Sequence, residues 1–300
     1  MDKICSLKEA VSKFVHDGDC LYAAGFTHLI PFAAGHEIIR QKKKNLTIAR
    51  ATPDLIYDQL VAAGCASKII FSYIGNPGVG SLRYVRKEIE SGNLAWEEYS
   101  HFGMISRLQA GAAGLPFMPM KPTGAEDLEH HNTQYRRVVD PYSGGEVVVV
   151  PALNPDVAII HVQKVDSNGN AQIWGIVGEQ KEAAFASSHV IITAEEIVDE
   201  SVIRSDPNRT IIPGMVVDAV CHVPHCAHPS YTQGYYDRDN QFYLEWDALS
   251  ADAEKMQDYL DEWVFGVADR NEYWQKLGAD THQRLAVPDA YSTPVNYGDY

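Results

Sequence analysis

At 300 residues, the chain is long enough to bury a full hydrophobic core, as one large α/β domain or two small ones. Its net charge of −15 argues against nucleic acid as a partner, since phosphate binding needs a basic face. Five cysteines without a short repeated spacing argue against a disulfide framework and for a reducing cytoplasm. No segment resembles a signal peptide or approaches the roughly 18 apolar residues of a membrane span, so we expect a cytoplasmic protein with no membrane partner.

Short apolar strands alternate with helical periods in the first third of the chain. The sequence from Ser6 to Glu9 is a capping box, which predicts a helix over residues 7–16. Three strand–helix pairs are then expected, with strands at 20–24, 46–50 and 68–73 and helices at 32–41, 54–63 and 81–91. This alternation is typical of βαβ units and predicts an α/β fold with an open, mainly parallel sheet and helices on both faces.

The middle of the chain is less regular. Residues 121–145 are rich in Glu, His, Gly and Pro and predict a long excursion that carries interactions. Further strands are expected at 146–150, 157–163, 171–174, 190–193 and 216–223, with a hairpin turn at 166–170 and a helix at 102–113. A helical C-terminal part is expected over about 248–300, with helices near 250–265 and 270–277. We expect residues 1–300 to form a single domain.

Polar residues and glycines follow the first three predicted strands. Right-handed crossovers bring these strand ends to one edge of a parallel sheet, and ligands of open α/β proteins bind at that edge. The candidate binding residues there are Gly25, Phe26, Thr27, His28, Thr52, Asp54, Asn76, Gly78, Gly80 and Ser81. Gly25 lets the backbone approach a ligand closely. The loop at 75–81 also carries Gly-x-x-Gly-x-Gly ahead of a helix, an arrangement that binds anions through main-chain amides.

The stretch 17–31 resembles the strand–loop signature of family I coenzyme A transferases, in particular of their A (alpha) subunits, although Tyr22 stands among its apolar positions and Ala24 replaces a glycine. Similar blocks follow in order from about residue 6 to about residue 280: 35–40, 52–55, 75–81, 114–117, 193–197, 213–215, 228–230 and 234–237. The blocks at 27–31, 52–54 and 75–81 look closest to 3-oxoadipate CoA-transferase A subunits, and the glutaconate CoA-transferase A subunit is the next nearest.

The resemblance implies the open α/β fold of this family and an enzyme made of two kinds of subunit. Members use a glutamate nucleophile in a Ser-Glu-Asn-Gly type motif on the B subunit. That motif is absent from this sequence, so no catalytic residue is expected in this chain. The implied partner is a B subunit, in a heterodimer or a dimer of heterodimers. An acyl-CoA and a dicarboxylic acid are the implied substrates, and no permanently bound cofactor is expected.

The implied reaction moves coenzyme A from succinyl-CoA to a short dicarboxylic acid, with 3-oxoadipate as the best guess and aromatic degradation through β-ketoadipate as the pathway. One alternative keeps the chemistry and changes the acid to glutaconate. A second is an acyl-CoA hydrolase or decarboxylase of the same fold. A third, of a different class, is a module that binds a small anion without turnover. The intact strand-end loops favour the enzymes.

Roles at the site follow from the resemblance. Amides of Gly25, Phe26 and Thr27 would stabilise the oxyanion formed when the thioester is attacked, with a tight turn required by packing alone as the alternative. The glycine loop would bind the acyl carboxylate or coenzyme A, and the residues leave that choice open. Ser100 reads as a helix N-cap that places His101 near the sheet edge, for a substrate carboxylate or for acid–base work, with an ordinary surface histidine as the alternative.

The densest group of metal-type ligands lies at 221–228, Cys-His-Val-Pro-His-Cys-Ala-His. Thiolates and imidazoles suit zinc, but the spacing is wrong and no second Cys-x-x-Cys pair exists, so no metal is expected. His228, at the end of this group, is a candidate contact for substrate or for the partner chain. Glu195 and Glu196 are interpreted as acidic residues at a helix start rather than as nucleophiles.

Overall fold

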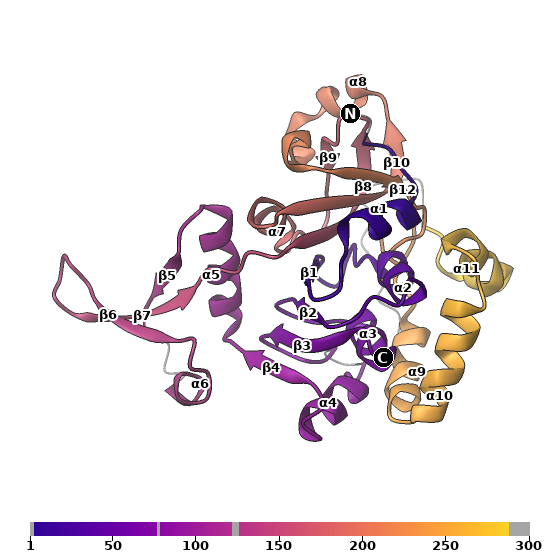
Figure 1. The fold of residues 1–300 in the computed structure, drawn as a ribbon. Coiled ribbons are helices and arrows are strands. Elements are labelled where there is room, and N and C mark those ends of the chain that lie inside the picture. Colours follow the sequence, from indigo (N-terminus) through magenta and orange to yellow (C-terminus); the bar gives the residue numbers. More distant parts are fainter. Residues whose placement is uncertain (1–2, 77–78, 122–125, 288–300) are drawn as a thin grey trace.

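The computed structural model describes residues 3–76, 79–121 and 126–287. Over the first third of the chain it confirms the predicted alternation of strands and helices (Figure 1). The elements there are α1 (Leu7–Phe14), β1 (Cys20–Ala23), α2 (Phe32–Arg40), β2 (Leu46–Ala49), α3 (Leu55–Ala62), β3 (Ala66–Phe71) and α4 (Arg83–Glu90). The capping box at Ser6 and Glu9 is present, so α1 begins where the sequence predicts.

The main sheet is parallel over its central strands, in the order β12-β10-β8-β1-β2-β3-β4. Its later strands are β4 (Ala95–Glu98), β8 (Val157–Asp166), β10 (His189–Val198) and β12 (Ala219–His222). The short strands β9 (Ala171–Gln172) and β11 (Thr210–Ile212) extend it in antiparallel fashion. The β8–β9 hairpin lies where the turn signal at 166–170 predicts it.

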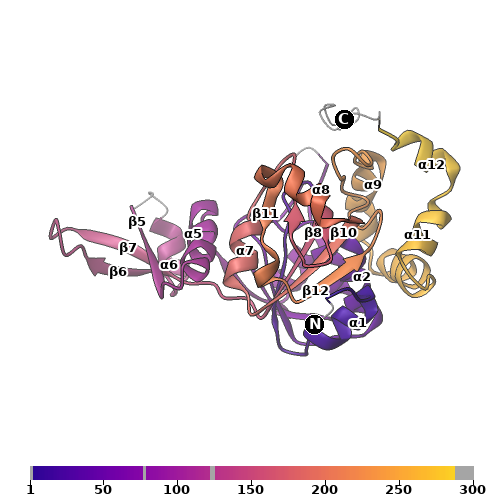
Figure 2. The same cartoon turned by 90° about the horizontal axis from the view of Figure 1, so that it is seen from above.

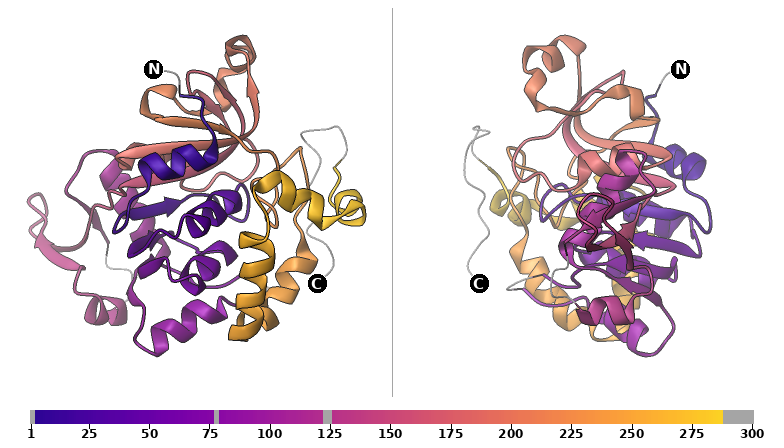
Figure 3. Two further views of the ribbon diagram at one scale, coloured as in Figure 1. Left: turned by 45° about the vertical axis from the view of Figure 1, so that its right-hand side comes forward. Right: turned by 90° about the vertical axis from the view of Figure 1, so that its left-hand side faces the viewer.

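Helices cover both faces of this sheet, as predicted, and successive residues of β1 alternate between the two cores. Leu21 belongs to the core beneath α1, α2 and α3, and Tyr22 to the core on the other face. That second face is covered by α5 (His101–Ala112) and α7 (Gln180–Ala186), and α8 (Glu200–Ser205) follows β10 (Figure 3). In the described part of the chain, none of the helices has the length and apolarity that crossing a bilayer requires.

The predicted excursion is a separate three-stranded antiparallel sheet that projects from the body beside α5 (Figure 2). It is larger than the predicted segment 121–145 and consists of β5 (Phe117–Met120), α6 (Glu126–His131), β6 (Arg136–Val139) and β7 (Glu146–Pro151). The central strand β7 pairs with β5 on one side and with β6 on the other.

The C-terminal part is helical and packs against α2, α3 and α4 (Figure 1). Its elements are α9 (Asn240–Ser250), α10 (Ala253–Tyr259), a π-helical turn (Leu260–Phe265), α11 (Arg270–Leu277) and α12 (Ala279–Arg284). Trp246 of α9 shows how this layer is attached, since its ring is buried and its Nε1 donates to Asp58 Oδ2 of α3 at 3.0 Å.

Glu195 and Glu196 do not begin a helix, so their interpretation as a helix-start pair is wrong. Both lie within β10, which continues to Val198, and α8 begins only at Glu200. Neighbouring residues of a strand point to opposite faces of the sheet, and the two side chains accordingly differ in environment. Glu195 is buried and Glu196 is half-exposed.

Candidate functional site

The turn after β1 is built around Gly25, whose φ of +137° is a backbone conformation that other residues rarely adopt. A Cβ atom there would lie 2.8 Å from the carbonyl oxygen of His28 and 2.9 Å from that of Leu29. The Phe26 amide donates to the His28 carbonyl at 3.2 Å and closes the turn. Of the three amides expected to stabilise an oxyanion, the one of Phe26 is therefore already used by the chain itself.

His28 lies beneath this turn and is fully buried. Its Nε2 accepts a hydrogen bond from the Gln233 amide at 3.0 Å, so its Nδ1 carries the proton and donates to the Ile176 carbonyl at 3.0 Å. Burial lowers the pKa of His28 to about 4, and the ring is neutral at physiological pH. Direct contact with a substrate would require the ring to leave both of these partners.

The segment after β2 contributes Thr52 and Asp54. Thr52 is partly exposed, whereas Asp54 is buried as the N-cap of α3. Its Oδ1 accepts hydrogen bonds from the Leu55 amide at 2.7 Å and from the Tyr243 hydroxyl at 2.9 Å. Asp54 thus joins α3 to α9, and its carboxylate is occupied by the chain's own donors.

Arg50, the residue that follows β2, was not among the candidates. Its guanidinium is buried, and its Nη2 donates to the Gly25 carbonyl. Its Nε and Nη1 have no hydrogen-bond partner among the residues that the structure describes. A buried positive charge therefore stands directly behind the β1 turn. The signal for it was an arginine at the end of an apolar strand, a position the sequence analysis counted as part of the strand.

The glycine loop at 75–81 was predicted to bind a substrate anion, but a carboxylate of the chain itself contacts one of its amides. The Ser81 amide donates to Asp247 Oδ1 at 3.0 Å, and Arg83 forms a bidentate pair with the same carboxylate. A carboxylate of the chain, from α9, thus occupies the anion position at the start of α4. A Cβ atom at Gly80, where φ is +119°, would lie 2.8 Å from Asp247, and the Asn76 amide donates to the Gly80 carbonyl at 2.9 Å. Gly78 lies outside the described residues.

Ser100 is the N-cap of α5, as predicted, and its hydroxyl accepts a hydrogen bond from the Gly103 amide at 3.0 Å. His101 follows with an exposed side chain. Its Nδ1 lies 2.9 Å from the Ser72 hydroxyl, which itself donates to the Ala51 carbonyl at 2.6 Å. Because the single Ser72 proton is used, His101 Nδ1 is the donor, and its Nε2 keeps a lone pair.

The ends of β1 and β3 meet at His101, which itself follows the end of β4. Its ring lies edge-on to Phe26 with centroids 6.2 Å apart, so the turn after β1 contacts the start of α5. Ser72, from the end of β3, holds the imidazole in one tautomer. The structure therefore brings Phe26 and His101 together, as predicted for one edge, and adds Ser72, which the sequence analysis did not single out. An exposed imidazole whose Nε2 carries a lone pair can accept a proton or bind a carboxylic acid.

His228 does not share this edge. It is fully buried, its Nδ1 lies 3.0 Å from the Tyr273 hydroxyl, and its Nε2 lies 3.1 Å from Asp239 Oδ2. Burial lowers its pKa to about 4. The side chain fastens the 225–236 segment to α9 and α11, so contact with substrate would again require it to leave both partners.

The other ligand-type side chains of the 221–228 group also point to separate partners. His222 Nε2 donates to the Glu195 carbonyl at 3.1 Å, and Cys226 Sγ lies 3.4 Å from the Thr193 hydroxyl. Among the described residues, no three His, Cys, Asp or Glu side chains converge as metal ligands. All five cysteines are free thiols.

Comparisons with known proteins agree with this architecture. The family model described as "Coenzyme A transferase" matches residues 4–222. The A subunit of the 3-oxoadipate CoA-transferase of Pseudomonas knackmussii is 46% identical over 280 residues, covering 92% of this chain and 99% of that protein. The A subunit of the glutaconate CoA-transferase of Acidaminococcus fermentans is 38% identical, covering 96% of this chain and 95% of that protein.

The solved structures include the glutaconate coenzyme A-transferase of Acidaminococcus fermentans, which superposes with a TM-score of 0.87 at 36% identity over 95% of this chain and 96% of that chain. The residues 4–222 matched by the family model include both the open parallel sheet and the antiparallel excursion. Because the superposition covers 95% of the chain, it extends beyond residue 222 into the C-terminal part. The chain therefore belongs to the coenzyme A transferase family, as an A subunit of the 3-oxoadipate and glutaconate type.

Proposed function

We propose that this chain, paired with a B subunit, transfers coenzyme A from succinyl-CoA to a short dicarboxylic acid, with 3-oxoadipate as the preferred acceptor. The observation that supports this choice is the 46% identity to the A subunit of a 3-oxoadipate CoA-transferase over nearly the whole of both chains. The cytoplasm is the proposed location, in line with the absence of a disulfide framework.

The proposed chemistry is covalent and uses a glutamate of the B subunit. Its carboxylate attacks the thioester carbonyl of succinyl-CoA, the C–S bond breaks, and a mixed anhydride and coenzyme A thiolate result. The thiolate then attacks the glutamyl carbonyl, which releases succinate and leaves a glutamyl-CoA thioester. The acceptor carboxylate then attacks the glutamyl-CoA thioester, the same two steps run in reverse, and the acceptor departs as its CoA thioester. Succinate must therefore leave before the acceptor reacts.

This chain would contribute the surroundings of that reaction. The turn at Gly25 and Thr27 would present amides to the oxyanion that forms when a carbonyl is attacked. His101 would face the substrate carboxylate through Nε2, because Ser72 holds its other nitrogen. Coenzyme A enters as a substrate, in a heterodimer or a dimer of heterodimers.

The test is exchange of coenzyme A between succinyl-CoA and 3-oxoadipate, measured with this chain alone and with a B-type chain co-expressed. Exchange by the pair and not by either chain alone supports the proposal. Glutaconate as a much better acceptor would replace 3-oxoadipate by the second candidate acid. Release of free coenzyme A without exchange would favour the hydrolase. Release of carbon dioxide would favour the decarboxylase, and stoichiometric binding without turnover would favour the binding module.

A further inference from the structure

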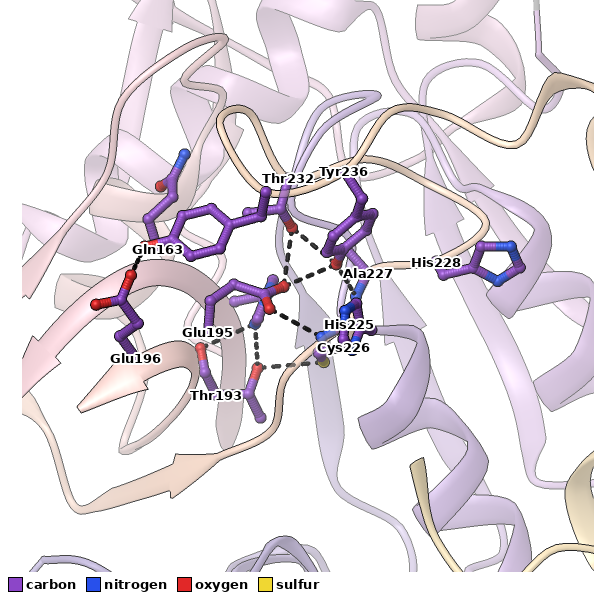
Figure 4. A network of polar contacts seen from close by, with 12 residues as sticks. Gln163, Thr193, Glu195, Glu196, His225, Cys226, Ala227, His228, Thr232 and Tyr236 are labelled. Atoms are coloured by element: carbon purple, nitrogen blue, oxygen red, sulfur yellow. Dashed lines mark hydrogen bonds and ion pairs between the residues drawn. The ribbon is translucent and has the colours of Figure 1, made fainter. Parts of the chain in front are cut away.

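Glu195 is the centre of a buried polar network in the second half of β10 (Figure 4). Its carboxylate accepts hydrogen bonds from His161 Nε2, the His225 amide and the Tyr236 hydroxyl, each at 2.8 Å, while the Thr232 hydroxyl, 3.2 Å from the carboxylate, donates its proton to the Tyr236 hydroxyl at 2.8 Å. Only 5% of the residue is exposed. Both carboxylate oxygens are occupied, which argues against Glu195 as an acyl acceptor.

The network is charged. Burial alone would raise the pKa of the Glu195 carboxyl, but hydrogen bonds from His161 and the segment 225–236 bring it below its ordinary value. Burial alone would lower the pKa of His161, and the adjacent Cys226 and Glu195 raise it to about 10. Glu195 and His161 thus form a buried ion pair that links β10 to β8. A pair of this kind depends on both partners, because removing one leaves an uncompensated buried charge.

Two of the three donors to Glu195, the His225 amide and the Tyr236 hydroxyl, belong to the segment 225–236, and the same segment holds the turn after β1. The Leu29 amide donates to the Tyr231 carbonyl at 3.0 Å, and the Ser230 hydroxyl donates to the Thr27 carbonyl at 2.8 Å. The Gln233 amide donates to His28 Nε2 at 3.0 Å. The segment is therefore fixed by Glu195 on one side and fixes the residues 27–29 on the other.

The turn needs such support because its backbone is strained. Thr27 has a φ of 55° and Leu29 a φ of 57°, and both are branched residues in the left-handed region. Conformations of this kind persist only where their surroundings determine them, and they gather at functional sites. The contacts from Ser230 and Tyr231 hold the peptides on either side of His28.

We propose that Glu195 is a positioning residue for coenzyme A transfer: its buried carboxylate fixes the segment 225–236, which holds the strained turn 27–29 in its working conformation. The inference rests on the proposed function of that turn. A misplacement of about 1 Å at a reacting centre can lower a rate by about 100-fold, so a small relaxation of the turn is sufficient.

The test compares Glu195→Gln with Glu196→Gln in the assembled pair. The two substitutions remove the same charge from neighbouring residues. Glu196 is the matched control because its side chain is 42% exposed, and the glutamine oxygen can still accept its one hydrogen bond from the segment, from the Tyr235 hydroxyl. We expect Glu195→Gln to lower kcat by about 10- to 100-fold with KM for succinyl-CoA changed by less than about threefold. Glu196→Gln should leave both constants within about twofold.

A second readout is amide hydrogen exchange in the peptide that spans residues 25–31. Glu195→Gln should speed exchange there, and Glu196→Gln should not, whereas a general loss of stability would raise exchange throughout the sheet. Where Glu195→Gln fails to assemble, Thr232→Val replaces it, because it removes the hydroxyl that holds Tyr236 against the carboxylate and keeps the ion pair. Its expected effect is a fall in kcat of about 3- to 10-fold.

An assembled Glu195→Gln pair with wild-type kcat and wild-type exchange in residues 25–31 would overturn the inference. So would faster exchange spread evenly over all strands. If the wild-type pair itself transfers no coenzyme A, the proposed function fails. The amide hydrogen exchange of residues 25–31 would then still decide whether Glu195 positions the turn.

Discussion

The carboxyl edge of the sheet has two halves that differ in how far their polar groups are paired. In the half formed by β1, β8 and β10, the buried side chains of His28, His161 and Glu195 each have two or more hydrogen-bond partners within the chain. In the half formed by β3 and β4, His101 is exposed and contacts Ser72 through Nδ1, and Tyr73 and Phe102 are 48% and 56% exposed. We call these the braced half and the open half.

The difference separates two tasks that one sheet edge performs. The braced half uses its polar groups to fix geometry, and it holds a strained turn against the 225–236 segment. The open half leaves an imidazole and apolar rings uncovered, which suits a substrate or a partner subunit that arrives later. A site completed by a second chain needs both: a rigid element that fixes the amides and an open surface that receives the other reactants.

Gly25→Ala should have the largest effect, because it places a Cβ atom in the braced half at a position where backbone atoms leave no space for it. The new Cβ would lie 2.8 Å from the His28 carbonyl oxygen at a φ of +137°. We expect coenzyme A exchange by the pair to fall by about 1,000-fold, and the free energy of unfolding by about 2–4 kcal/mol. Steady-state exchange and denaturant unfolding measure the two quantities.

Gly18→Ala is the matched control for that substitution. Gly18 also has a positive φ, +90°, but no atom lies within 4 Å of its would-be Cβ. Gly18→Ala should lower the free energy of unfolding by about 1–2 kcal/mol and leave the rate of coenzyme A exchange unchanged. Equal losses of exchange in both variants would mean that the turn has no special role in the reaction.

His101→Ala tests the open half. It removes the imidazole whose Nδ1 is held by Ser72 and leaves the N-cap of α5 at Ser100 in place. We expect kcat of the pair to fall by about 100-fold if the ring moves a proton, and KM for the acceptor acid to rise if it only binds the carboxylate. His130→Ala, an exposed histidine on the excursion, is the control. Unchanged kcat and KM would remove His101 from the site.

His28→Ala should lower turnover by about tenfold while assembly with the B subunit stays intact. The substitution removes the acceptor of the Gln233 amide and the donor to the Ile176 carbonyl, so the turn loses one of its supports rather than its amides. Exchange kinetics and gel filtration of the pair measure the two effects. Wild-type kcat and KM would exclude His28 from the site and from its support.

The buried His28 also predicts a pH dependence of stability. Its pKa is lowered by burial, and further by nearby His161, from 6.5 to about 4, so the unfolded chain takes up this proton before the folded chain does. Stability is therefore lost as the pH falls from 6.5 toward 4, by about 3 kcal/mol for this group. Denaturant unfolding of wild type and His28→Gln at several pH values measures it. The same slope in both would contradict the prediction.

Local patterns were sufficient for the parallel core and for the location of the edge. The apolar runs that become β1, β2 and β3 and the capping boxes or N-caps at Ser6 and Ser100 are signals within a few residues. The charged strand β4, Ala95–Glu98, was missed because it lies at the edge of the sheet, where one side needs no apolar cover.

Long-range pairings account for what the sequence could not predict at the site. Asp247 is 166 residues from the Ser81 amide that it binds, and Gln233 is 205 residues from His28. No local pattern announces that a carboxylate from α9 will take the anion position at α4. Glu195 was misread for the same reason, because its partners come from β8 and from the 225–236 segment rather than from its own neighbours.

Thr27→Gly should have the smallest effect, and it separates backbone strain from chemistry within the braced half. The glycine keeps the main-chain carbonyl that Ser230 contacts and removes a β-branched side chain at a φ of 55°. Relief of strain, about 1–2 kcal/mol, is offset by the greater entropy of glycine in the unfolded chain, about 0.5–1 kcal/mol, so stability should change by less than about 1 kcal/mol.

The Thr27 hydroxyl is buried without a partner among the described residues, so it is the one group the variant removes that could serve a ligand. If the amides of the turn act on the substrate, exchange should stay within about threefold of wild type. A fall of about 100-fold in kcat with unchanged stability would instead assign the oxyanion contact to the hydroxyl.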